Sequence, residues 1–181
     1  MQCNPDYEYR SKYSTLGVAP SEQKIAVFGR QILEALRYLE FINVPYYHLT
    51  AGNIIMDNGV CQLTGIELTL LGVRPSVHEH LARLVKKNPA ASPVLQFGHV
   101  LFEMAHGFEL DSPTPEYISN KVPRKVADAI EFIFRGVNVK EGIVQVPTIQ
   151  EVLEHPFFAD ALYQLRKSDL TFRPVRSRKS V

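Results

Sequence analysis

Apolar residues recur at helical spacing in four separate stretches of the chain, and each stretch predicts a helix. The first is the longest and follows an N-cap signal at Ser21, with Glu22 favourably placed in the first turn. The predicted helices cover about residues 21–42, 93–106, 123–135 and 148–155. A short continuation after His155-Pro156 is expected to hold Phe157, Phe158, Leu162 and Leu165.

A small β-hairpin is predicted directly after a polar, irregular stretch at residues 43–53. Residues 54–56 are apolar, and residues 60–63 alternate as a return strand. Between them, Asn58-Gly59 tolerates the positive φ angles of a tight turn. Residues 65–92 are weakly patterned and are expected to be irregular. The expected fold class is therefore mainly α, with little sheet and no βαβ alternation.

Composition and charge suit one soluble globular domain. The chain has 181 residues, of which 45% are hydrophobic and 22% charged, and its formal net charge is +1. Nucleic acid is not expected as a partner, since it usually requires a strong basic excess. Cys3 and Cys61 are expected to be free thiols in a reducing compartment. No apolar run approaches the ~20 residues of a membrane span. We therefore expect a cytoplasmic protein. Peripheral attachment to a membrane is an alternative within this expectation.

The polar stretch before the hairpin has the frame of a protein-kinase catalytic loop, which reads His-Arg-Asp-Leu, three residues, then Asn. In that frame Asn53 matches the family's metal-binding asparagine. His48 stands where the aspartate that accepts the substrate hydroxyl proton would be. Tyr46 and Tyr47 replace the histidine and the arginine. The loop therefore predicts a kinase-like site that has lost its base.

The metal-binding motif is degenerate as well. The family's Asp-Phe-Gly should follow the hairpin, and Gly65-Ile66-Glu67 stands in that place. Gly65 has no side chain with which to hold Mg²⁺, and Glu67 comes two positions late. A cation site here would require a backbone that differs from that of the family.

Two later stretches continue the pattern of a kinase. Residues 96–104 look like the central buried helix of the large lobe, and residues 147–158 resemble its last helix with a His-Pro-Phe-Phe ending. Pro93 replaces a structural aspartate, Val146 replaces an arginine, and no Ala-Pro-Glu motif lies between the hairpin and the central helix. Over about residues 20–160, the chain resembles the C-terminal lobe of a protein-kinase domain.

This resemblance implies an α+β kinase-like fold in which the N-terminal lobe, with its glycine-rich loop and strand lysine, is absent. The expected organisation is an extended lead-in at 1–20, the lobe at 21–165 and a basic tail at 166–181. The chain is therefore expected to be a fragment or a truncated gene model.

A narrower resemblance rests on residues 3–5, 29–34 and 70–72 and on the loop centred on His48. These stretches are similar to the pseudokinase family of the PX-domain-containing kinase-like protein and the Slowpoke-binding protein. Membership implies an inactive scaffold or regulator whose protein partner is a membrane ion channel or ion pump. It implies no catalytic residue, metal or cofactor, and ATP with Mg²⁺ only if a complete N-terminal lobe exists. The alternative is a fragment of a weakly active ATP-dependent serine/threonine kinase whose N-terminal lobe is missing.

Two histidine clusters are candidate metal sites. His99, Glu103 and His106 lie at i, i+4 and i+7, which places them on one helical face. A buried structural helix explains them better, because the central helix of a kinase is buried. The cluster at residues 78–80 is expected to be solvated.

The basic tail and one lobe face are candidate contact surfaces. Residues 166–181 hold six Lys or Arg residues against Asp169, a pattern that favours anionic lipid, while Ser177 and Ser180 could be phosphorylated and read by a phospho-motif partner. A solvated tail is the simpler interpretation. An apolar patch is expected near residues 44–64 and 1–20, where the missing lobe would sit.

Overall fold

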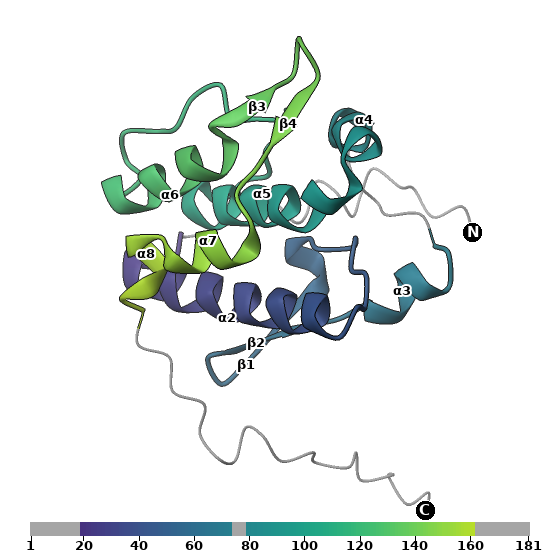
Figure 1. Cartoon of the computed structure of the whole chain (residues 1–181). Helices are drawn as coiled ribbons and strands as arrows, with labels where there is room; N and C mark the ends of the chain where they lie inside the picture. Colours follow the sequence, from purple (N-terminus) through teal and green to yellow (C-terminus); the bar gives the residue numbers. More distant parts are fainter. Residues whose placement is uncertain (1–18, 74–78, 162–181) are drawn as a thin grey trace, which may run out of the picture.

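The structure, a computed structural model, describes residues 19–73 and 79–161 (Figure 1). The helices are α2 (Glu22–Phe41), α3 (Ile66–Leu70), α4 (Glu79–Lys87), α5 (Ser92–His106), α6 (Arg124–Phe134), α7 (Ile149–Glu154) and α8 (Pro156–Ala159). The strands form two antiparallel hairpins, β1 (Ile54–Asp57) with β2 (Val60–Leu63) and β3 (Gly136–Asn138) with β4 (Ile143–Gln145). The prediction of a mainly α fold is confirmed.

Several predicted features lie outside the described residues. They are Cys3, the lead-in as far as residue 18, His78, the continuation through Leu162 and Leu165, and the tail 166–181. The predicted division into lead-in, lobe and tail therefore stays a prediction.

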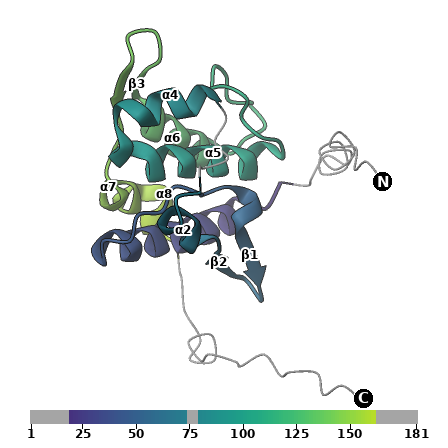
Figure 2. The same cartoon turned by 90° about the vertical axis from the view of Figure 1, so that its right-hand side faces the viewer.

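Helix α2 is the centre of the fold. Ser21 caps it by accepting a hydrogen bond from the Lys24 N–H at 3.4 Å, as its sequence position predicts. Its buried face packs against α5, α7 and α8, while β2 crosses its other side. Figures 1 and 2 show the β1–β2 hairpin below α2, with α5 and α6 above it. This arrangement places the segment between α2 and β1 at the end of the central helix.

Helix α5 forms the second layer and packs closely on α6. A Cβ added at Gly98 would lie 2.6 Å from the Phe134 ring and 3.0 Å from Ile133 Cγ2, so only glycine lets the two helices approach this far. The predicted stripe of α5 is buried, with Met104 half-buried at its end. Gly107 ends the helix in the left-handed region, at φ 78°.

Two predictions about secondary structure were wrong. Residues 65–92 are not irregular throughout, because they contain α3 and α4. Helix α4 has nine residues and buries only Leu81 and Leu84 fully among its described side chains, which is too short a pattern to separate from noise.

The second error is the β3–β4 hairpin, which the sequence did not predict. Each strand has three residues, so the alternation expected of a strand barely repeats. Gly136 does not end the preceding helix, since that helix stops at Phe134 and Gly136 is the first residue of β3. A Cβ on Gly136 would collide with the Gln145 carbonyl oxygen, which explains glycine at this position.

Candidate functional site

One side chain of α5 holds the kinase-like loop, residues 46–53, by two hydrogen bonds. The Leu49 N–H donates to Gln96 Oε1 at 3.0 Å, and Gln96 Nε2 donates to the Tyr47 carbonyl oxygen at 2.7 Å. Gln96 is only 2% exposed, so both hydrogen bonds are shielded from water. The amide therefore satisfies two backbone groups that burial would otherwise leave unpaired.

His48 is a buried structural side chain. It is 6% exposed, and its Nε2 lies 3.2 Å from the Val73 carbonyl oxygen. A carbonyl can only accept, so Nε2 carries the proton and donates. This nitrogen cannot take a proton from a substrate hydroxyl while it makes that bond. His48 thus ties the loop to the segment after α3.

Asn53 is also used inside the loop. Its Nδ2 donates to the His48 carbonyl oxygen at 2.7 Å. The Asn53 carbonyl oxygen accepts from the Thr64 N–H at 2.9 Å and from Thr64 Oγ1 at 3.1 Å. The two bonds from Thr64 close the loop onto the end of the β1–β2 hairpin, and the bond to His48 orients the Asn53 side-chain amide.

Tyr46 and Tyr47 anchor the start of the loop. The Tyr46 hydroxyl donates to the Thr64 carbonyl oxygen at 2.8 Å, and the Tyr47 N–H donates to Thr69 Oγ1 at 3.3 Å. Burial, with a smaller contribution from the charge of Glu67, raises the pKa of Tyr46 to about 12. Tyr46 therefore keeps its proton at neutral pH and serves as a hydrogen-bond donor.

Gly65, which the sequence predicts to stand in the place of the metal-binding aspartate, has a positive φ. Gly65 has φ +70° and precedes α3, and a Cβ there would lie 2.9 Å from Leu68 Cδ1. Glu67 is exposed in the first turn of α3. Among residues 19–73 and 79–161, no group of three His, Cys, Asp or Glu side chains could hold a metal ion.

Two buried glutamines were missed as site residues. Besides Gln96, Gln31 of α2 holds the hairpin, since its Oε1 accepts from the Cys61 N–H at 2.6 Å and its Nε2 donates to the Gly59 carbonyl oxygen at 3.0 Å. Both lie on otherwise apolar helical faces. An uncharged amide within such a face is the signal that could have identified them.

The packing of the hairpin against Gln31 has a chemical consequence at Cys61. Burial raises the pKa of its thiol to about 11, so at pH 8 the thiolate fraction is roughly 100-fold below that of an ordinary cysteine. In a Cys3→Ser variant, we expect iodoacetamide to react correspondingly slowly in buffer and rapidly in urea. Gln31→Leu should speed the reaction in buffer. Equal rates with and without urea would contradict the packing described.

The histidines of α5 turn to the following loop. His99 Nε2 lies 3.3 Å from the Pro113 carbonyl oxygen. His106 Nδ1 lies 3.0 Å from the Phe102 carbonyl oxygen, and its Nε2 accepts from the Ser119 N–H at 3.2 Å. Both nitrogens of His106 are therefore committed to the backbone, which leaves none for a metal. The side chains of the 78–80 cluster lie outside the described residues.

His106 predicts a dependence of stability on pH. Burial lowers its pKa, although the bond to the Phe102 carbonyl partly opposes this, and burial also lowers the pKa of His155. In acid, these histidines bind protons more readily in the unfolded chain than in the folded one. The stability that is present above pH ~6.5 is therefore lost as the pH falls through their pKa values in the folded protein. We expect a lower urea midpoint at pH 5.5 than at pH 7.5, and a smaller difference in His106→Phe. Identical midpoints at the two pH values would contradict this account.

Comparison with known proteins gives the loop its context. The chain is 35% identical over 163 residues to the "Probable inactive serine/threonine-protein kinase slob2" of Dictyostelium discoideum, which covers 86% of this chain and 26% of that protein. It is 34% identical over 141 residues to the mouse "PX domain-containing protein kinase-like protein", covering 77% of this chain and 24% of that protein. The chain belongs to this kinase-like family.

A third member of the family is the "Slowpoke-binding protein" of Drosophila melanogaster, 39% identical over 88 residues, which are 48% of this chain and 17% of that protein. No protein-family model matches the chain. The chain spans about a quarter of the length of the first relatives it matches. The predicted resemblance to this pseudokinase family is confirmed, and the word "inactive" in the Dictyostelium name supports the prediction of a chain that is not an enzyme. Within the described ranges, no helix has the length and apolar character needed to cross a bilayer.

Proposed function

We propose that this chain is an inactive kinase-like lobe that works by binding another protein, and that the partner is a membrane ion channel or ion pump. The observation that carries the proposal is the use of the loop's polar groups. His48, Asn53 and Tyr46 each make internal hydrogen bonds that fix the shape of the loop. A loop built in this way supports a rigid surface and lacks the charges of a phosphoryl-transfer site.

The chemistry of phosphoryl transfer explains why the loop is a poor catalyst. That reaction depends on metal ions that bridge phosphates and on a carboxylate that orients the attacking hydroxyl. His48 uses its Nε2 for the bond to the Val73 carbonyl oxygen and carries no carboxylate, and Gly65 offers no ligand. We propose that the protein needs neither ATP nor Mg²⁺ for its function. The alternative, a weakly active serine/threonine kinase, requires a base and a metal ligand from residues outside this loop.

Exposed apolar side chains next to the loop support a binding role. They lie at the end of α2, on β1 and at the end of α3, three elements that adjoin the loop. The largest are Tyr38, Phe41, Ile55, Met56, Leu70 and Leu71. Phe41 and Leu71 are 81% and 72% exposed. Exposed apolar surface of this kind commonly marks a protein contact.

The class of partner follows from the family. A relative named Slowpoke-binding protein supports a channel as partner, and such a partner implies that the protein works in the cytoplasm at the membrane surface. The experiment is binding of the purified full chain to the cytoplasmic parts of a Slowpoke-type potassium channel and of a sodium pump. We expect saturable binding to one of them, and Phe41→Asp or Leu71→Asp should weaken it at least tenfold.

A matched control is Val139→Asp, because Val139 is also exposed but lies between β3 and β4, on the opposite side of α2 from the β1–β2 hairpin. This variant should bind as the unchanged chain does. Failure of the folded chain to bind either transport protein would refute the proposal. Equal binding by all three variants would refute the surface assigned to it.

A further inference from the structure

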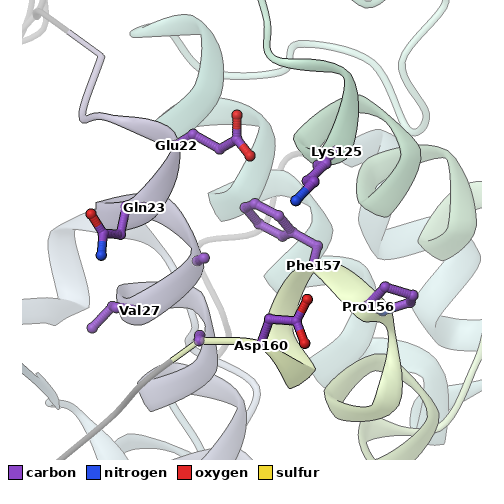
Figure 3. A pocket seen from close by; sticks show the side chains of 9 residues that line it. Glu22, Gln23, Val27, Lys125, Pro156, Phe157 and Asp160 are labelled. Atoms are coloured by element: carbon purple, nitrogen blue, oxygen red, sulfur yellow. The ribbon is translucent and has the colours of Figure 1, made fainter.

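A pocket of about 310 Å³ opens on the edge of the fold far in sequence from the kinase-like loop. It lies where the first turns of α2 meet the start of α6 and helix α8 (Figure 3). This volume is at the lower end of the range for ligand sites, so it suits one or two side chains better than a nucleotide. No residue of the loop lines it.

The floor of the pocket is apolar and fixed by the core. Phe157 and Ala26 are 5% and 8% exposed and belong to the main hydrophobic cluster. The Phe157 ring is held edge-on by Phe158, with ring centroids 4.9 Å apart. Val27, Pro156 and Ala161 complete the apolar lining. A ligand would therefore meet a preformed apolar floor, because Phe157 cannot move without disturbing the core.

Three charged side chains surround this floor. Figure 3 shows Glu22, Lys125 and Asp160 grouped around the ring of Phe157, each from a different helix or helix end. Within the described part of the chain, none of the three makes a hydrogen bond or an ion pair with another residue. The rim thus carries two carboxylates against one ammonium, all available to a ligand.

We propose that this pocket binds a basic side chain, arginine or lysine, of a partner protein. The aliphatic stem of such a residue would lie on the Phe157 ring, and its charged end would reach the Glu22 and Asp160 carboxylates. The Lys125 ammonium repels the same ligand, so its removal is expected to strengthen binding. The proposal is independent of the partner suggested for the loop face.

The test uses the full chain and a hexapeptide of alternating leucine and arginine, with a leucine–glutamate hexapeptide as the control. Binding is followed by NMR amide shifts of the ¹⁵N-labelled protein. We expect the arginine peptide to shift the amides of residues around Ala26 and Phe157, and the glutamate peptide to leave them unchanged. Binding of both peptides, of neither, or shifts confined to other regions would overturn the proposal.

Charge variants make the test specific. Glu22→Lys combined with Asp160→Lys should weaken the arginine peptide about tenfold, since it removes two attractive contacts and adds repulsion. Lys125→Ala should strengthen binding about threefold by removing repulsion. Glu40→Lys makes one such charge reversal, half the change of the double variant, on an exposed position at the other end of α2 and should leave affinity within twofold. Equal losses in the double variant and in Glu40→Lys would overturn the proposal.

Discussion

Replacing Gln96 with leucine is expected to lower the free energy of unfolding by about 2–4 kcal/mol. Leucine keeps the bulk of the side chain but removes both hydrogen bonds to the loop. The Leu49 N–H and the Tyr47 carbonyl oxygen would then be buried without partners, and each unpaired group costs about 1–3 kcal/mol. The measurement is urea unfolding of the two proteins, followed by circular dichroism.

Gln62→Leu is the matched control for this prediction. Gln62 is exposed on β2 and makes no side-chain hydrogen bond that the described residues show. Its replacement should change the free energy of unfolding by no more than about 0.5 kcal/mol. If the two variants were equally stable, the clamp formed by Gln96 would contribute nothing, and the loop would owe its shape to other contacts.

Replacing Phe158 with alanine is expected to lower the free energy of unfolding by about 3–5 kcal/mol. Phe158 is fully buried where α2, α5 and α8 meet. Its ring contacts the position of Gly29, where an added Cβ would lie 2.6 Å away, and stands 5.7 Å from the Phe97 ring centroid. The same residue's carbonyl oxygen accepts from Arg30 Nη1 at 2.9 Å.

Phe41→Ala provides the control, because it deletes the same atoms from a side chain that is 81% exposed. We expect a change of about 0.5 kcal/mol or less in the urea-derived free energy. A loss of less than about 1 kcal/mol in Phe158→Ala would contradict the packing that we assign to the His-Pro-Phe-Phe ending.

The long elements of this fold were predictable because their signals repeat. Helix α2 runs for 20 residues, so its apolar stripe and its Ser21 cap agree over five turns. The β1–β2 turn was predictable for a different reason, since Asn58 and Gly59 adopt the positive φ angles that Asn-Gly favours. Short elements such as α4 and β3 offer too few repeats for such a signal.

The sequence predicts the frame of the site but not its interactions. The spacing from Tyr46 to Asn53 predicts a kinase-like loop and Gly65 a lost metal position, and both assignments stay predictions. Nothing local in the sequence indicates that Gln96, 47 residues after Leu49, makes two of the loop's hydrogen bonds, to Leu49 and Tyr47. Pro93 stands in the place of the family's structural aspartate and has no polar side chain. The Gln96 amide, about one turn further along α5, holds the loop.

His48 shows how these contacts change the interpretation of one residue. By sequence alone, a histidine in the place of a catalytic base leaves proton transfer open, since its ordinary pKa lies near 6.5. The His48 ring bonds to the Val73 carbonyl oxygen, and the His48 carbonyl oxygen accepts from Asn53. These two bonds give His48 a structural role. We therefore propose that the kinase-like loop of this protein serves for its shape.

The most direct test of this account is transfer of labelled γ-phosphate from ATP to a generic protein substrate, with Mg²⁺ or Mn²⁺ present. The full chain, His48→Ala and an active protein kinase would be measured side by side. We predict that the chain and the His48→Ala variant give the same rate as a protein-free blank, while the active kinase gives a clear rate. Phosphate transfer by the chain that disappears in His48→Ala would contradict the account.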